Sequence, residues 1–175
     1  YKLMLAITGS SGLLGSCVAI ESKKRNLPFR ALVREGRSSA LTSLGIEPSC
    51  VVEADILDIP ALLRAFDGVQ TVVHCAARVS FNPRDKKKIY EINVGGTQNV
   101  VNACLEQGVR QLIHVSSVAA FGRQKTVNSI NENTHWSPDL RQTHYGESKY
   151  LAELEVYRGM EEGLQIMLVN PSVIL

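Results

Sequence analysis

Short apolar or β-branched runs alternate along the chain with longer stretches in which apolar residues recur at helical spacing. The runs that predict strands span residues 3–8, 29–33, 50–53, 71–75, 111–115 and 165–169. The stretches that predict helices span residues 13–25, 59–66, 86–107 and 145–162. Because parallel strands are joined by right-handed crossovers, this alternation predicts an α/β fold, a doubly wound parallel sheet with helices on both faces.

The overall charge excludes some classes of partner. The 175 residues carry a formal net charge of +2 and contain no basic stripe, so we expect no nucleic-acid partner. The densest basic run, Lys86-Lys87-Lys88, has Asp85 and Glu91 beside it and is typical of a solvated helix face. No apolar run is long enough to cross a membrane, so no membrane partner is expected either.

The four cysteines lie far apart among apolar neighbours, without the spacing of a metal site or a disulfide framework. This usage predicts buried thiols in a reducing compartment, and therefore a cytoplasmic protein with no metal centre. The residues are Cys17, Cys50, Cys75 and Cys104.

A glycine-rich turn stands between the first expected strand and the first expected helix. It reads ITGSSGLLGS and contains Gly9, Gly12 and Gly15. Without side chains in the way, backbone N–H groups and a helix N-terminus can face an anion there, and a dinucleotide pyrophosphate is the favoured ligand. Alone, the run fits a tight turn with close helix–sheet packing equally well, and its spacing differs from the common Gly-x-Gly-x-x-Gly.

A second candidate site combines a tyrosine and a lysine in HYGESKYLAE. Tyr145 and Lys149 are four residues apart at the head of an expected helix, so they project from the same face. An ammonium close to a phenol favours the phenolate, which suits acid–base work near neutral pH. An isolated pair of this kind usually lies on a helix surface. Here, however, HVSSVAAFG also places Ser116 and Ser117 at the carboxyl end of the fifth strand, where ligands bind in open parallel sheets.

These motifs together resemble the extended branch of the short-chain dehydrogenase/reductases. TGSSGLLG is similar to the TGxxGxxG turn of that family and YGESK to its YxxxK, with EADILD, HCAA, NVGGTQNVV and VSSVAAFG in the same order. The resemblance implies a Rossmann fold. It also implies that residues 1–175 are one dinucleotide-binding domain, and that the carboxyl-terminal substrate lobe of the family is absent from this sequence, which we interpret as a partial chain.

The resemblance assigns roles to individual residues. Tyr145 exchanges a proton with the substrate oxygen, Lys149 assists it and holds the nicotinamide ribose, and Ser117 binds the developing oxyanion. For His74 and His114, packing or a structural hydrogen bond is favoured over proton transfer. Besides Tyr145 and Lys149, the residues assigned to the cofactor are Gly9, Gly12, Leu13, Leu14, Asp55, Ile56, Cys75, Ala76, Ala77, Asn93, Pro171 and Ser172.

The reaction is narrowed by the residues around these motifs. Sugar-nucleotide dehydratases of the family carry Asp-Glu where Val118-Ala119 stand here, so a dehydratase is disfavoured. HCAARVSF and VNPSVIL look closest to dihydroflavonol reductases and hydroxysteroid dehydrogenases, which implies hydride transfer with a small secondary alcohol or ketone. A sugar-nucleotide epimerase is the alternative enzyme. A non-catalytic nucleotide sensor is the alternative of another class, and a homodimer stays open.

The choice of cofactor depends on ALVREGRSS. The second strand of such a fold ends beside the adenosine ribose, and the residue expected there is Arg34. Its guanidinium can grip a 2′-phosphate, with Arg37 and Ser38 within reach, which favours NADP over NAD. Alternatively, Arg34 is only a solvated loop residue and Glu35 binds the ribose hydroxyls, as an NAD site requires.

Overall fold

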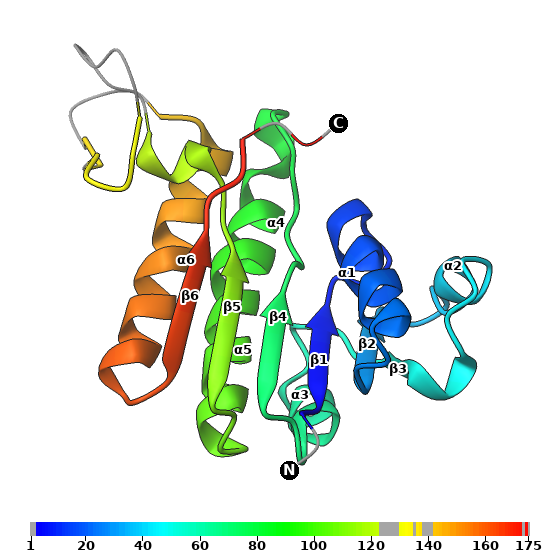
Figure 1. The fold of residues 1–175 in the computed structure, drawn as a ribbon. Helices are drawn as coiled ribbons and strands as arrows, with labels where there is room; N and C mark the ends of the chain where they lie inside the picture. Colours follow the sequence, from blue (N-terminus) through cyan, green and yellow to red (C-terminus); the bar gives the residue numbers. More distant parts are fainter. Residues whose placement is uncertain (1–2, 123–129, 135, 138–141, 173, 175) are drawn as a thin grey trace.

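Six parallel strands form a single sheet in the computed structural model, which describes residues 3–122, 130–134, 136–137, 142–172 and 174 (Figure 1). The strand order is β3-β2-β1-β4-β5-β6, so the chain changes direction across the sheet between β1 and β4. This order confirms the predicted doubly wound parallel sheet. The strands are β1 (Leu5–Thr8), β2 (Phe29–Val33), β3 (Val51–Glu53), β4 (Thr71–His74), β5 (Gln111–Val115) and β6 (Gln165–Val169).

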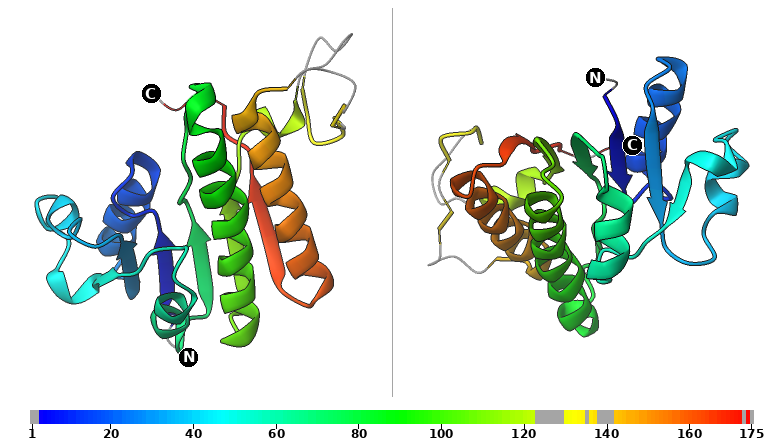
Figure 2. Two further views of the ribbon diagram at one scale, coloured as in Figure 1. Left: turned by 180° about the vertical axis from the view of Figure 1, so that it is seen from behind. Right: turned by 90° about the horizontal axis from the view of Figure 1, so that it is seen from below.

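Helices cover both faces of the sheet, as predicted (Figures 1 and 2). One face carries α1 (Leu13–Lys24) and the short α2 (Ser39–Thr42), whose Ala19 and Leu41 are buried against the sheet. The other face carries α3 (Ile59–Phe66), α5 (Gly96–Glu106) and α6 (His144–Glu161).

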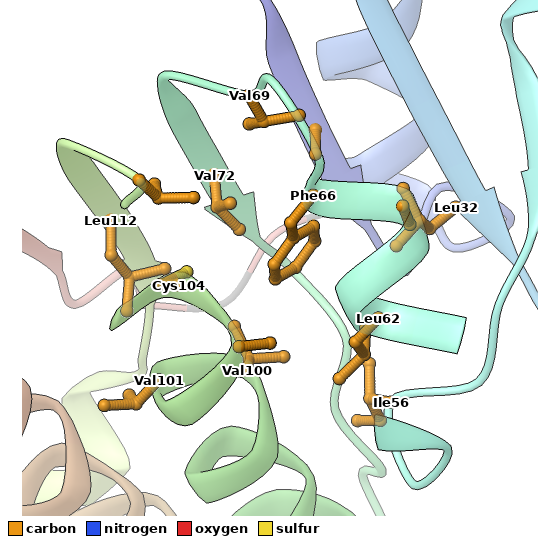
Figure 3. Close-up of a cluster of buried hydrophobic side chains, with 14 of the residues drawn as sticks. Leu32, Ile56, Leu62, Phe66, Val69, Val72, Val100, Val101, Cys104 and Leu112 are labelled. Atoms are coloured by element: carbon orange, nitrogen blue, oxygen red, sulfur yellow. The ribbon is translucent and has the colours of Figure 1, made fainter. Parts of the chain in front are cut away.

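The larger core lies between the sheet and the helices α3, α5 and α6. Figure 3 shows Phe66 of α3 and Val100 of α5 pointing toward the same interior as Val72 of β4 and Leu112 of β5. Each of these four side chains is fully buried, and burial of this kind contributes about 1.5–3 kcal/mol for each large side chain. The core therefore holds the strands and these helices in fixed relative positions.

One expected helix is interrupted. The stretch 86–107 divides into α4 (Lys86–Tyr90), a π-helical turn (Glu91–Gly95) and α5. The turn carries Asn93 into the interior, where its amide pairs with the peptide of Arg78 and with Ser148. A π-helical turn widens a helix by one residue, which changes the direction of the side chains that follow it.

The cysteines differ in one respect from the expectation. Cys104 is buried, and Cys50 and Cys75 are partly buried, but Cys17 is exposed. Cys17 lies on α1 between Gly15 and Ala19, both of which are buried against the sheet, so the helix turns it toward solvent.

Two buried histidines lie side by side on β4 and β5, with ring centroids 5.1 Å apart. The ring of His74 makes hydrogen bonds with Thr8 Oγ1 (2.7 Å) and Thr97 Oγ1 (3.0 Å), a structural role. The ring nitrogens of His114 have no hydrogen-bond partner among the described residues. Burial lowers the pKa of His74 to about 3 and holds the pKa of His114 well below its usual range. Both rings are therefore neutral in the folded protein.

The neutral histidines predict an acid-sensitive fold. Below about pH 6.5 the histidines of the unfolded chain bind protons, whereas the buried rings of the folded protein stay neutral. The free energy of unfolding therefore falls as the pH falls. Between pH 7 and pH 5, each histidine contributes up to about 2 kcal/mol to this loss. His114→Leu removes one such group and its unpaired nitrogens, so urea unfolding at the two pH values should give a smaller loss than in the wild type. An identical loss in both proteins would contradict this account.

Candidate active site

The glycine turn leaves an open helix N-terminus. Gly9 follows β1 with φ +68°, and a Cβ atom there would lie 2.6 Å from the backbone nitrogen of Ala76. Gly12 is the N-cap of α1 and its N–H donates to the Gly9 carbonyl at 2.9 Å. Within the part of the chain that the structure describes, no side chain caps α1, and Ser11 and Gly12 are exposed. The backbone N–H groups of this first turn are therefore available to an anion.

A groove of about 750 Å³ runs from this turn along the carboxyl edge of the sheet. Its size suits a ligand as large as a nucleotide. Among the predicted cofactor residues, those that line it are Gly9, Gly12, Arg34, Asp55, Ile56, Cys75, Ala76 and Ala77.

Other predicted cofactor residues lie outside the lining of this groove. Leu13 is exposed and Leu14 half-buried on α1. Asn93 is 1% exposed, with its amide engaged by Arg78 and Ser148. Pro171 and Ser172 follow β6, and the carbonyl of Pro171 accepts from the N–H of Val118 at 3.1 Å. Their contacts with a cofactor stay predictions.

The three predicted catalytic residues gather at the carboxyl ends of β5 and β6. Lys149 of α6 is 2% exposed, and its Nζ donates to the carbonyl of Val115, the last residue of β5, at 2.8 Å. Burial lowers the pKa of Lys149 to about 8. Tyr145 lies in the first turn of α6, one helical turn before Lys149. Ser117 follows β5 and caps a short 3₁₀ turn, where its Oγ accepts from the N–H of Ala119 at 3.2 Å.

A close backbone contact brings Tyr145 beside the turn of Ser117. A Cβ atom on Gly146 would lie 2.8 Å from the carbonyl oxygen of Ala119, so only glycine lets α6 approach this turn so closely. Thr143 fixes the start of the helix, because its Oγ1 accepts from the N–H of Gly146 at 3.0 Å. The local sequence of α6 thus determines where the phenol lies.

Exposed apolar side chains lie in the segment that contacts Tyr145. The side chain of Asn93 binds both backbone groups of Arg78. Its Oδ1 accepts from the Arg78 N–H (2.7 Å), and its Nδ2 donates to the Arg78 carbonyl (3.0 Å). The segment that follows presents Val79, 62% exposed, and Phe81, 76% exposed. The ring of Phe81 meets that of Tyr145 edge-on, with centroids 6.1 Å apart. An exposed ring beside the candidate proton donor, with exposed Val79 in the lining of the groove, favours an apolar ligand.

A second hollow of about 550 Å³ adjoins the groove at the end of β2. Arg34 and Arg37 line both spaces, and Arg64 of α3 joins them in the second. Their guanidinium groups make no hydrogen bond or ion pair with the described residues. Glu35 also lines this second hollow.

Most carboxylates of this hollow are already engaged. Glu53 accepts from the N–H of Gly36 (3.2 Å) and the hydroxyl of Ser38 (2.8 Å). Asp55 accepts from a backbone N–H at 2.9 Å, and Asp58 caps α3 by accepting from another at 3.0 Å. None of these acids forms an ion pair with the three arginines among the described residues, so the guanidinium N–H groups remain open to an added anion.

Sequence reasoning missed some residues of the site. Arg64 belongs to no motif, and Val79 and Phe81 lie in HCAARVSF but were assigned no role. Their place follows from the packing of α3 and from the hydrogen bonds of Asn93 to Arg78. Within the described residues, no group of three metal-binding side chains occurs. No described helix has the length and apolarity to cross a membrane.

A sequence profile described as the NAD dependent epimerase/dehydratase family matches residues 5–175. The chain belongs to this family. The match confirms the resemblance on which the site residues were predicted, and the described fold is the Rossmann-like fold of the family's solved structures.

Family members of known name are similar over nearly all of this chain. "Sterol demethylase protein B" of Methylococcus capsulatus is 31% identical over 97% of this chain and 51% of its own length. A "putative dihydroflavonol 4-reductase" of Synechocystis is 30% identical over 95% of this chain and 48% of its own. A short-chain dehydrogenase/reductase superfamily protein of Agrobacterium tumefaciens, solved with bound NAD, is 25% identical and superposes with a TM-score of 0.80. The match covers 95% of this chain and 48% of that protein. The chain spans about half the length of the relatives it matches.

The contact at Gly146 makes a testable prediction. Gly146→Ala forces a methyl group against the Ala119 carbonyl, and we expect it to lower the free energy of unfolding by about 1–3 kcal/mol. The matched control is Gly95→Ala, also in a helical segment, where nothing lies within 4 Å of the added atom. Chemical denaturation measures both, and equal stabilities would show that α6 tolerates a wider spacing from the turn.

Proposed function

We propose that the protein is an NAD(P)-dependent oxidoreductase that transfers a hydride between nicotinamide and a secondary alcohol or ketone. The observation that carries this proposal is the buried ammonium of Lys149, bonded to the end of β5 one helical turn from Tyr145 and close to the turn of Ser117. The family match supports a nicotinamide cofactor.

The groove fits a dinucleotide. Gly9 lets the turn pack directly against the backbone of Ala76, and the open N-terminus of α1 offers N–H groups to a pyrophosphate. In this proposal Asp55 and Ile56 flank the adenine, and the segment 75–77 lies along the ribose. When bound, the nicotinamide supplies or accepts the hydride.

The residues of the chain then handle the proton. In ketone reduction, the phenol of Tyr145 donates its proton to the substrate oxygen as the hydride reaches the carbon. The hydroxyl of Ser117 donates a hydrogen bond to the same oxygen and stabilises its developing charge. The ammonium of Lys149 favours the phenolate that remains. In alcohol oxidation the same groups act in reverse.

Val79 and Phe81 support a substrate with an apolar ring system. Phe81 lies beside Tyr145, where the reacting carbon would lie, and Val79 lines the neighbouring groove. The relative named as a dihydroflavonol 4-reductase points to the same class of substrate.

Tyr145→Phe tests the catalytic assignment. Removing the phenolic proton should lower kcat by at least about 100-fold, while the Kd for the nicotinamide cofactor stays within about twofold. The absorbance of reduced nicotinamide measures turnover in the full-length protein with a panel of cyclic ketones. Tyr157→Phe, on the exposed side of the same helix, is the control. Retention of most of kcat would remove Tyr145 from the mechanism, and conversion of a sugar nucleotide without net nicotinamide reduction would favour an epimerase.

We propose further that NADP is preferred over NAD. Arg34, Arg37 and Arg64 converge on the hollow at the end of β2 without partners among the described residues, which suits a 2′-phosphate. Glu35 lines the same hollow and is the residue that would favour NAD instead.

Cofactor preference is measurable by calorimetry with both nucleotides. Charge-assisted contacts of about 1.5–3 kcal/mol each should give NADP at least a tenfold lower Kd than NAD. Arg34→Ala should reduce this ratio, whereas Arg84→Ala, an exposed arginine outside both hollows, should leave it unchanged. Equal or tighter binding of NAD to the wild type would mean that Arg34 does not bind the 2′-phosphate of NADP.

A further inference from the structure

A buried carboxylate lies one turn beyond Lys149, and the mechanism above does not use it. Glu153 of α6 is 7% exposed, and its Oε1 accepts from Asn170 Nδ2 at 2.6 Å. A buried carboxylate is costly unless charge or hydrogen bonds compensate it, so its surroundings indicate what it does.

Asn170 connects Glu153 to the turn of Ser117. The same Nδ2 atom donates to the carbonyl of Ser117 at 3.2 Å. The backbone reinforces this link, because Ser116 N–H donates to the carbonyl of Val169 (2.8 Å) and Val118 N–H to that of Pro171 (3.1 Å). The carbonyl of Ser117 is thus held by Asn170 after β6, and Asn170 is held in turn by Glu153 of α6.

The charges around Lys149 give Glu153 a second role. The thiol of Cys75, at the end of β4, faces Lys149, but burial raises the pKa of Cys75 to about 11 and keeps it neutral. His74 and His114 face Lys149 from β4 and β5, and both rings are neutral because burial lowers their pKa. Tyr145 lies one turn before Lys149 on α6. Among the described residues, Glu153 is therefore the carboxylate that acts on the ammonium.

We propose that Glu153 and Asn170 are positioning residues of the proposed active site, which fix the peptide of Ser117 and supply the negative charge that faces the Lys149 ammonium. This inference rests on the proposed function. One amide nitrogen of Asn170 contacts both Glu153 and Ser117. The pair therefore connects the residue that would bind the oxyanion with the carboxylate that acts on Lys149. Neither side chain needs to touch the substrate.

Glu153→Gln separates charge from shape, since glutamine keeps an acceptor for Asn170 and loses the negative charge. NMR titration of protein labelled with ¹³C-lysine follows Lys149, whose signal is the one missing from Lys149→Met. The wild-type group should titrate near pH 8, and in Glu153→Gln about one pH unit lower. Glu155→Gln removes a carboxylate of the same helix that pairs with Arg158, and it should leave the titration unchanged.

The pH profile of alcohol oxidation by the full-length protein gives the functional readout. In Glu153→Gln, earlier loss of the ammonium makes the phenolate harder to form, so the acid-side half-maximal pH should rise while KM changes little. Asn170→Ala cuts the link to Ser117 without removing a charge. We expect it to lower kcat about ten- to 100-fold and to leave the lysine titration near pH 8.

The outcomes distinguish the two proposals. A wild type without nicotinamide-dependent turnover would overturn the proposed function, whereas the lysine titration would still test the charge of Glu153. An active wild type whose Lys149 titration is the same in Glu153→Gln would overturn the inference. If Glu153→Gln does not fold, Asn170→Ala decides, because unchanged kcat in that variant would overturn the positioning role.

Discussion

The hydrogen bond from the buried ammonium of Lys149 to the last carbonyl of β5 is the constraint on which the site depends. An ammonium out of water is costly, so α6 cannot slide along the sheet without exposing that charge to an apolar surface. The bond acts with the close contact at Gly146, which sets the distance between α6 and the turn after β5. Together they position the phenol of Tyr145 by packing, before any ligand contributes.

The strands of the sheet could be predicted because each is encoded by a short continuous run of residues. The runs 29–33, 111–115 and 165–169 are strands over the expected residues, since β-branched and apolar side chains in short runs suit a strand in a parallel sheet. Seven of the eight groove residues were predicted from motifs in fixed order along the chain, and Arg34 from its place at the end of the second strand. Whether they hold a cofactor is a question of chemistry that the sheet alone does not answer.

Other features depend on contacts between distant segments, and the sequence carries no local sign of them. The π-helical turn exists where Asn93 meets the peptide of Arg78, fifteen residues earlier in the chain. The hollow at the end of β2 could not be predicted either, because Arg64 reaches it from α3, a separate segment of the chain. Three arginines and four acids line the hollow, and three of those acids accept hydrogen bonds from neighbouring neutral donors. Which side chains remain open to a ligand therefore depends on contacts that the sequence does not show.

The strand order has a consequence for how such a site can change over time. β1 and β4 are neighbours in the sheet, but the chain leaves them toward opposite edges, so the crevice at their carboxyl ends is a product of topology. Substitutions among the lining residues can change what is bound there without closing the space. The strand order therefore fixes where the crevice lies, while the side chains that line it are free to vary in their chemistry.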